Sequence, residues 1–431
     1  MNLQNRKRPA ITKLVSDQKI PKFFKAKQIF ERPCIGRSYI EDTVFKTLNR
    51  DLLKNKIKPD MSIAITVGSR GINNIDEITK SIVNFVKKQG ANPFIIPAMG
   101  SHGGATAEGQ KEMIAGFGVT EETMGCPVKS SMEVVPIGKN AEGIEVFIDK
   151  YAYEADGIIV SARVKPHTAF RGDYESGLLK MMAIGLGKQY GAEVCHESGF
   201  HNMAKNIQLF GRTILDNSNI LFGLAILENA YDETYRLEGI DSSEIFEKEP
   251  ELLKDAYAHM PRILVDDCDV LLVDEIGKNF SGDGMDPNIS GRFIRTGISG
   301  GINAQKVGLF GLSEVSHGNA IGIGLAEAMT ERIANDLDLN SMYMNSITNT
   351  TFSATKIPMI MESDKELIQV LIKTCNEIDK ENPRIIRIKN TLHIGEILMS
   401  EAYLNEIKDI DNLEIASDLF ELEFDENGDL W

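Results

Sequence analysis

Short runs of β-branched and other apolar residues alternate with amphipathic segments and glycine-rich turns along much of this chain. Residues 61–67 and 92–97 are two such runs, and between them residues 75–89 place apolar side chains at helical spacing. A further run follows at residues 157–161. Strands that alternate with helices predict β-α-β units, in which helices cover both faces of a mainly parallel sheet. The expected fold class is therefore α/β.

The same alternation restarts near Pro261. Strands are expected at residues 262–265 and 270–273, and residues 307–310 and 320–333 are expected to form the next strand and helix. A chain of 431 residues is long enough for two domains that each bury a core of their own.

We therefore expect a two-domain protein. Residues 1–260 would form an N-terminal α/β domain, and residues 261–395 a C-terminal α/β domain that closes over the substrate. Residues 396–431 are a candidate to return to the first domain. Because small-molecule sites commonly lie between domains, the active site is expected in the interdomain cleft.

The charge balance narrows the class of ligand. The sequence has 47 Lys and Arg residues and 63 Asp and Glu residues, which give a formal net charge of −16. Binding to nucleic acid needs a basic face that neutralises phosphates, so we expect no nucleic-acid partner. A small anionic substrate stays compatible with this charge, because a local Arg and Lys pocket can sit in an acidic protein.

Cysteine usage and hydropathy indicate a cytoplasmic protein. The five cysteines are far apart, odd in number and without a Cys-x-x-Cys pair, so reduced thiols are expected rather than disulfides or a zinc site. The basic N-terminus is not followed by the apolar segment of a signal peptide. No run approaches 18 uninterrupted apolar residues, so we expect no membrane segment. Self-association into a homo-oligomer stays open.

Histidines occupy turns that follow the predicted strands. The turns are residues 68–71, 100–104 and 161–168, and the last two contain His102 and His167. Ligands of open α/β sheets bind beyond the carboxyl ends of the strands, so we expect these turns to share one site. Histidine exchanges protons near neutral pH. Two histidines that flank a substrate carbon therefore suggest a pair of proton-transfer groups.

A lysine among small and apolar residues is the second unusual feature. Ser176, Gly177 and two leucines precede Lys180, and only apolar residues and glycines separate it from Lys188. Desolvation of such an amine makes it nucleophilic, which suits covalent capture of an electrophile. His196 follows Lys180 by sixteen residues and is a candidate ligand for nickel, zinc, copper or iron. No carboxylate triad or His-x-x-x-His pair accompanies it, so an organic cofactor that supplies further ligands fits better than a protein-only metal site.

These residues resemble those of the nickel-pincer nucleotide-dependent lactate racemases and their superfamily of 2-hydroxy-acid racemases and epimerases. The likeness runs from about residue 60 to about residue 310. It rests on the turn that contains His102, with Thr106 and Glu108 after it, and on the downstream residues His167, Ser176, Gly177, Lys180 and His196. The combination of His102, Lys180 and His196 is more specific than any one of them.

The resemblance implies a cofactor. In that family a lysine equivalent to Lys180 carries the nickel-pincer nucleotide, pyridinium-3,5-bisthiocarboxylic acid mononucleotide nickel, through a thioamide. Ser176 and Gly177 would lie in the cofactor-binding segment, and His196 would complete the coordination of nickel. The N-terminal domain would then be catalytic and cofactor-binding, and cofactor-biosynthesis enzymes would be partners of the chain.

The resemblance also implies a reaction. His102 and His167 would be the paired acid and base groups, and Arg70 would bind the carboxylate of a small anionic 2-hydroxy-acid substrate. One histidine would remove the hydroxyl proton while hydride moves from C2 to the pincer. Return of the hydride to the other face of the resulting 2-keto acid would complete racemisation or epimerisation, which makes the protein an isomerase.

The second domain adds candidate substrate-binding cations. Lys278, Arg292 and Arg295 lie in the Gly- and Asp-rich residues 277–301, where the resembled lactate enzymes have one lysine and a glutamine. Arg171 adds a cation near the first-domain bases. Each arginine can fork two hydrogen bonds to a carboxylate, which a lysine cannot. A substrate larger and more anionic or more hydroxylated than lactate is therefore favoured. The alternative is that these arginines form surface salt bridges with Asp and Glu.

Two functions from other classes stay open. A non-enzymatic protein that binds a metabolite or nucleotide would need the glycine-rich turns but not His102 or His167. A cofactor-free lyase or dehydratase would keep those paired histidines but would need neither Lys180 nor His196.

Overall fold

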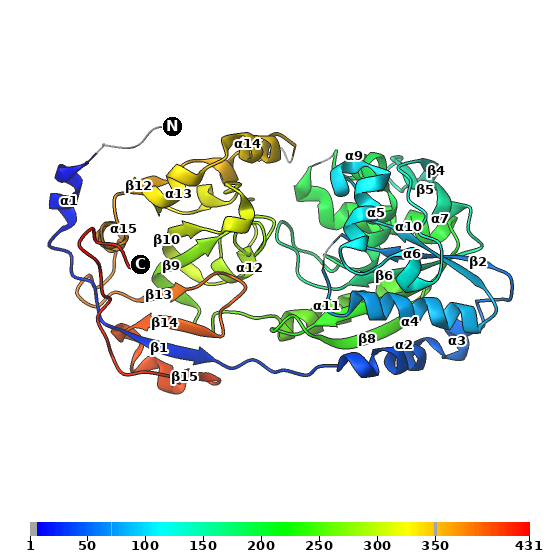
Figure 1. Ribbon diagram of the computed structural model, residues 1–431, viewed down its shortest axis with the longest axis horizontal. Coiled ribbons are helices and arrows are strands. Elements are labelled where there is room, and N and C mark those ends of the chain that lie inside the picture. The colour runs from blue at the N-terminus through cyan, green and yellow to red at the C-terminus, as the bar shows by residue number, and fades with distance from the viewer. Residues whose placement is uncertain (1–6, 70, 198, 349–350) are drawn as a thin grey trace. The chain divides into compact units, whose positions relative to one another are not determined.

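A computed structural model describes residues 7–69, 71–197, 199–348 and 351–431 (Figure 1). The chain divides into an N-terminal unit, Glu31–Met260, and a C-terminal unit that combines Met1–Phe30 with Pro261–Trp431. Each unit contains a mainly parallel sheet with helices packed on it, so the predicted α/β class is confirmed.

The sheet of the N-terminal unit has the strand order β3-β2-β6-β7-β8 in the described residues. The first four of these strands are parallel, and β8 is an antiparallel edge strand. A separate antiparallel pair, β4 and β5, completes the strands of this unit. Their bounds are β2 (Ser62–Val67), β3 (Asn92–Pro97), β4 (Val134–Lys139), β5 (Glu145–Asp149), β6 (Gly157–Arg163), β7 (Ile220–Glu228) and β8 (Thr234–Asp241).

The helices of the N-terminal unit connect these strands. A run of π-helical turns at Met181–Leu186 separates two of them. Among the described residues, no helix in either unit has the length and apolar character needed to cross a membrane. The helices are α2 (Ile40–Leu48), α3 (Asp51–Lys54), α4 (Ile75–Lys88), α5 (Ala107–Ala115), α6 (Glu121–Met124), α7 (Lys150–Tyr153), α8 (Leu178–Lys180), α9 (Lys188–His196), α10 (Met203–Asn217) and α11 (Ile245–His259).

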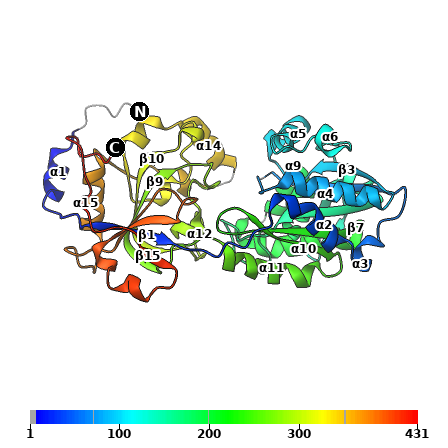
Figure 2. The same ribbon diagram turned by 60° about the horizontal axis from the view of Figure 1, so that its bottom comes forward.

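Side chains of the N-terminal sheet alternate between two hydrophobic clusters. Ile63 and Ile65 of β2 lie in the cluster that includes α2 and α4, whereas Ala64 lies in the cluster that includes α10 and α11. Figure 2 shows α4 on one side of the sheet and α10 and α11 on the other. A parallel sheet covered on both faces buries every side chain of its strands, which explains the uninterrupted apolar runs in the sequence.

The sheet of the C-terminal unit is mixed. In the described residues its order is β12-β11-β10-β9-β13-β14-β1-β15, parallel from β12 to β13 and antiparallel from there on. The strands are β1 (Phe23–Gln28), β9 (Asp267–Ile276), β10 (Asn303–Leu312), β11 (Ala328–Thr330), β12 (Met359–Met361), β13 (Ile385–Ile388), β14 (Glu396–Ser400) and β15 (Leu413–Ile415). The helices are α1 (Pro9–Val15), α12 (Pro287–Ser290), α13 (Glu331–Asp336), α14 (Leu339–Thr348) and α15 (Asp364–Thr374).

The two ends of the chain meet in this mixed sheet. β1 lies between β14 and β15, and Ala26 is in register with Ile397 on one side and Ile415 on the other. The prediction that the first domain includes residues 1–30 is therefore wrong, and so is the return of residues 396–431 to that domain. Pairing between strands so distant in sequence leaves no local signal in either segment.

Two expected elements of the C-terminal unit are absent from its described residues. Residues 262–265 form no strand, because the chain stays irregular until β9 begins at Asp267. Residues 320–333 are not one helix but an irregular turn followed by β11 and α13. Gly322 has φ +100°, and a Cβ there would lie 1.9 Å from the carbonyl oxygen of Asp283. This close approach of two backbones excludes a helix at that point.

Replacing Phe23 with alanine is expected to lower the unfolding free energy of the C-terminal unit by about 3–5 kcal/mol. The Phe23 side chain is fully buried in the cluster that includes β9 and α15, so its removal leaves a cavity. Urea unfolding followed by hydrogen exchange and mass spectrometry resolves the two units. Lys27→Ala, at an exposed position of the same strand, should change stability by less than about 0.5 kcal/mol. Loss of stability confined to the N-terminal unit would contradict the placement of β1.

Candidate functional site

Two turns lie at the carboxyl ends of the neighbouring parallel strands β2 and β3. Ser69 belongs to the first turn, and the second contains His102, whose side chain is exposed. The Nδ1 atom of His102 forms a hydrogen bond with the Oγ atom of Ser69. Arg70, expected to bind the substrate carboxylate, lies outside the described residues. The hydrogen bond joins the two turns at the edge of the sheet where ligands of this fold class bind.

Backbone pairing closes the loop after β6 and brings His167 next to Lys180. Lys165 and Ser176 pair through two backbone hydrogen bonds, with N···O distances of 3.0 and 3.2 Å. Beyond this pairing, the Nε2 atom of His167 and the Nζ atom of Lys180 form a hydrogen bond. Both side chains are half-buried. The structure thus brings together two residues that the sequence proposed for one site.

The surroundings of His167 keep its ring neutral. Burial holds the pKa of His167 well below its ordinary value, and the positive charges of Lys180, Lys165 and Arg171 act in the same direction. The backbone N–H of Ala169 donates to the Nδ1 atom at 3.0 Å. An imidazole whose Nδ1 accepts in this way carries its single proton on Nε2, which faces Lys180.

A buried carboxylate, Glu175, holds the loop that carries His167. Its Oε2 atom accepts a hydrogen bond from the backbone N–H of His167 at 2.6 Å, and its Oε1 atom accepts one from the hydroxyl of Tyr257 at 2.9 Å. Arg171 lies 3.5 Å from the same carboxylate and donates to the carbonyl oxygen of His167 at 2.5 Å. Arg171 therefore stabilises the loop rather than extending from it as a separate cation.

The segment after Lys180 packs against the turn that follows β3. Its π-helical turns, Met181–Leu186, have a geometry that is rare overall and frequent at functional sites. A Cβ on Gly185 would lie 2.7 Å from the carbonyl oxygen of Ala98, so only glycine fits there. The N–H of Gly100 points to the carbonyl oxygen of Gly185 at 3.4 Å. These backbone contacts bring the Lys180 segment against the turn that bears the exposed histidine.

Glu249 of α11 lies at the start of the Lys180 helix. Its side chain is buried, and its Oε2 atom accepts a hydrogen bond from the N–H of Leu179 at 3.0 Å. Its Oε1 atom has no hydrogen-bond partner among the described residues. Burial raises the pKa of Glu249 to about 7, although the N–H groups of Leu179 and Leu178 oppose the shift. A Cβ on Gly177 would lie 2.3 Å from Oε1, so a larger residue there would displace this carboxyl group.

His196 is the last residue of α9 and is half-buried. Its charge is one of the influences that lower the pKa of His167, which places the two rings within electrostatic range. Burial raises the pKa of the preceding thiol, Cys195, to about 12, so this sulfur stays protonated at neutral pH. No three His, Cys, Asp or Glu side chains in the described part of the chain are arranged to hold a metal ion.

The three cations proposed for the C-terminal unit have different partners. Arg292 pairs with Glu327, at 3.0 Å between Nη2 and Oε2, which matches the salt-bridge alternative for this residue. Arg295 donates to the hydroxyl of Thr351 at 2.9 Å, and burial lowers the pKa of this guanidinium. Lys278 is exposed, and its Nζ atom donates to an asparagine of α14 at 2.6 Å. Lys278 and Arg295 therefore border the α14 region, whereas Arg292 is held beside β10.

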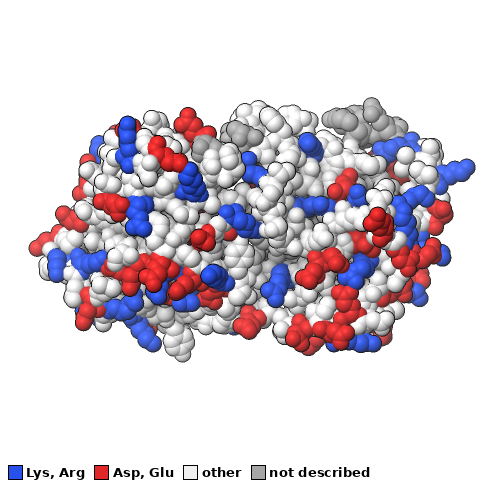
Figure 3. Space-filling view, turned by 180° about the vertical axis from the view of Figure 1, so that it is seen from behind, with Lys and Arg blue, Asp and Glu red and all other residues white. Residues whose placement is uncertain are grey.

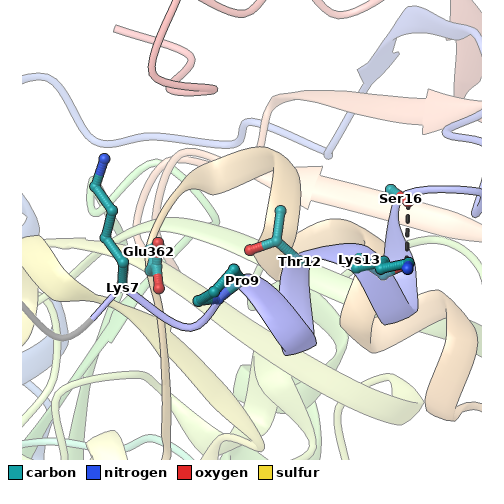
Figure 4. A pocket seen from close by; sticks show the side chains of 6 residues that line it. All are labelled: Lys7, Pro9, Thr12, Lys13, Ser16 and Glu362. Carbon is teal, nitrogen blue, oxygen red and sulfur yellow. Dashed lines mark hydrogen bonds between the residues drawn. The ribbon is translucent and has the colours of Figure 1, made fainter.

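Two pockets of the C-terminal unit do not involve the histidines or Lys180. One, drawn in Figure 4, borders α1 and is lined by Lys7, Pro9, Thr12, Lys13, Ser16 and Glu362. The other is lined by Asp274, Arg387, Lys389, Glu396, Ile397 and Leu398. On the face drawn in Figure 3, basic and acidic side chains are interspersed over the surface. The candidate site is thus defined by its side-chain arrangement and not by either pocket.

The arrangement described so far is that of an α/β protein with two histidines in turns at the carboxyl edge of a parallel sheet and a lysine hydrogen-bonded to one of them. The family model of the lactate racemase N-terminal domain matches residues 10–207, a segment that includes His102, His167, Lys180 and His196. The resemblance to the lactate racemase-like superfamily is therefore confirmed.

Among solved structures, the chain is similar to the lactate racemase apoprotein from Thermoanaerobacterium thermosaccharolyticum. The sequence identity is 15%, the alignment covers 82% of this chain and 92% of that chain, and the TM-score is 0.49. No curated protein matches the sequence.

Sequence reasoning missed the buried groups that hold the site. Glu175 and Glu249 were not singled out, because neither belongs to a motif and both act through tertiary contacts. Gln110 was missed for the same reason, although it is fully buried and donates to two carbonyl oxygens of the His102 turn. One sequence feature did indicate a buried charge. Lys188 follows a run of apolar residues and glycines.

Glu249→Gln is expected to remove a pH dependence from the stability of the N-terminal unit. The folded-state pKa of about 7 lies above the ordinary value of 4.5, so the neutral carboxyl stabilises the fold. This contribution is complete below pH 4.5 and is lost as the pH rises through 7. Between pH 6 and 8 the wild type should lose roughly 1 kcal/mol relative to Glu249→Gln, as measured by urea unfolding.

Glu247→Gln, on the exposed face of the same helix, is the matched control and should follow the wild type at each pH. An unfolding free energy that changes equally with pH in wild type and Glu249→Gln would show that Glu249 is ionised in the folded protein across this range.

Proposed function

We propose that this protein is a racemase or epimerase of a 2-hydroxy acid that uses a nickel-pincer nucleotide tethered to Lys180. The observation that carries the proposal is the hydrogen bond between the Nζ atom of Lys180 and the Nε2 atom of His167. Both residues lie in the segment that matches the lactate racemase N-terminal domain. The family supports the reaction class, and the local chemistry supports the tether.

The amine of Lys180 fits covalent attachment. The N–H of Ala169 donates a hydrogen bond to the Nδ1 atom of His167, so the neutral ring carries its proton on Nε2. Once Lys180 loses its proton, the ring can donate to the lone pair of the amine in this contact. An amine that offers a lone pair is the nucleophilic form that thioamide formation requires. His196 would supply one imidazole ligand, and the tethered group would supply the others.

When bound, the nickel-pincer nucleotide supplies a hydride acceptor and donor for the substrate C2. The histidines perform the proton transfers. His102 is exposed, and its ring is oriented by the hydroxyl of Ser69. His167 is held neutral by burial and by neighbouring cations, so it can accept the hydroxyl proton of the substrate. Each histidine would serve as base for one enantiomer and as acid for the other.

Substrate binding is assigned to basic side chains. Arg70 would hold the carboxylate by charge-assisted hydrogen bonds. Arg295 and Lys278 are further candidate cations for a substrate more anionic or more hydroxylated than lactate. Arg292 has a weaker claim, because its guanidinium is engaged by Glu327.

Co-expression with cofactor-biosynthesis enzymes of this family tests the tether. Intact-mass measurement should show an adduct of a few hundred daltons on the wild type, with stoichiometric nickel by elemental analysis. Lys180→Met should lose the adduct and the nickel, because it has no amine to form the thioamide. Lys205→Met, an exposed lysine of α10, should retain both.

The variant His196→Ala tests nickel binding independently of covalent attachment. It should keep the adduct on Lys180 and bind less nickel. Racemisation that persists in Lys180→Met would favour the cofactor-free lyase or dehydratase class instead. Metabolite binding without any turnover would favour the non-enzymatic class.

A panel of 2-hydroxy acids, followed by chiral chromatography, tests the substrate class. Holoenzyme should racemise malate, 2-hydroxyglutarate or aldonates faster than lactate. Arg295→Ala should lower kcat/KM for the preferred substrate about tenfold, which corresponds to one charge-assisted hydrogen bond. Arg292→Ala is the matched comparison and should have a smaller effect. Faster turnover of lactate, or an unchanged preference in Arg295→Ala, would contradict this assignment.

A further inference from the structure

Lys188 is a fully buried lysine at the start of α9. Its Nζ atom donates to the carbonyl oxygen of Pro97 at 2.7 Å and to the side-chain oxygen of Gln110 at 2.8 Å. A carboxylate oxygen of Asp149, itself buried, lies 3.4 Å from the same nitrogen. The ammonium group of Lys188 thus makes two hydrogen bonds and one ion pair with buried partners.

Gln110 connects Lys188 to the turn that contains His102. Its side-chain oxygen accepts from Lys188, and its side-chain nitrogen donates to the carbonyl oxygens of Gly100 and His102, at 2.8 and 3.1 Å. Gln110 is fully buried, so water cannot hydrogen-bond to its polar atoms. Loss of one of these hydrogen bonds would therefore leave a buried polar atom without a partner. Lys188 also donates to the carbonyl oxygen of Pro97, the last residue of β3, and therefore holds the chain just before the turn as well.

The backbone at Lys188 indicates that its position is enforced. Lys188 has φ +54°, a left-handed conformation that side chains other than glycine rarely adopt. Such strain persists only where surrounding contacts determine the conformation, and it is common at functional sites. The run of π-helical turns that begins directly after Lys180 ends at Leu186, two residues before Lys188. The segment that carries the proposed tether thus continues into the residue that holds the histidine turn.

Asp149 compensates the buried charge and does not touch the turn. Its Oδ1 atom accepts from the N–H of Ala152 at the start of α7, and its Oδ2 atom faces Lys188. Burial lowers the pKa of Lys188 and raises that of Asp149, while the attraction between them opposes both shifts. Asp149 therefore stabilises the lysine, whereas Gln110 connects the lysine to the turn.

We propose that Lys188 is a positioning residue that acts through Gln110 to fix His102 relative to Lys180. The inference rests on the proposed function in that it gives the anchored histidine its proton-transfer role. Loss of the Lys188–Gln110 connection leaves the fold and the tether in place but lets the turn move. His102 then no longer occupies one position beside the substrate.

Hydrogen exchange measured on the full chain without cofactor tests this connection. The readout is the exchange rate of the amides of residues 100–106 divided by that of the amides of β2 in the same unit. The ratio removes changes in global stability. Lys188→Met should raise it about tenfold, because a buried hydrogen-bond connection is lost.

Gln110→Glu and Asp149→Asn are the two matched variants. Gln110→Glu keeps an acceptor for Lys188 but loses both N–H donors to the turn, so the ratio should rise about as much as in Lys188→Met. Asp149→Asn weakens the buried charge pair and leaves the contacts to the turn intact, so the ratio should stay within about twofold of the wild type.

An unchanged ratio in Lys188→Met, or an equal rise in Asp149→Asn, would show that Lys188 only contributes to stability and would overturn the proposal. If Lys188→Met does not fold, Gln110→Glu decides by the same criterion. In loaded enzyme, Gln110→Glu should lower kcat and leave KM within about twofold, because positioning acts on the chemical step. Absence of any racemase activity in the wild type would contradict the proposed function and leave the exchange result intact.

Discussion

Two backbone hydrogen bonds between Lys165 and Ser176 set the geometry on which the rest of the site depends. They close the loop after β6, so that His167 faces Lys180 in the helix that follows. Side-chain chemistry alone would not achieve this contact, because a histidine in an open loop samples many positions at an entropic cost that binding would have to overcome. Glu175 strengthens the closure by accepting hydrogen bonds from inside the loop.

Buried ionisable groups are concentrated around this loop and the helix it precedes. Glu175, Glu249 and Lys188 are all nearly inaccessible to water, and each is hydrogen-bonded to the backbone near a candidate functional residue. Removing a charge from water costs several kcal/mol, and apolar side chains of the same size would often be more stabilising. Such groups contribute a defined geometry, because a hydrogen bond fixes the position of a backbone atom more narrowly than apolar packing does.

The sequence predicted the parts of the fold that local patterns determine. The strand at residues 92–97 and the helix that begins at Ile75 are recovered almost to the residue, because their apolar spacing reflects burial on the sheet. The turns with His102 and His167 followed from the rule that ligands bind at the carboxyl ends of parallel strands. The buried partners of these histidines could not be predicted in the same way. Glu249 reaches the Lys180 helix from a segment with no distinguishing motif.

The family match and the structural units divide the chain differently, and β1 explains why. The match to the lactate racemase N-terminal domain begins at residue 10 and therefore includes a strand that belongs to the C-terminal sheet. Phe23 and Phe24 of this strand are fully buried between β14 and β15 and the helices beside them. The apolar pattern of residues 23–28 is consequently a property of the C-terminal core. A stretch of sequence that is inherited as one domain need not fold as one, because its strands find partners by burial and not by order along the chain.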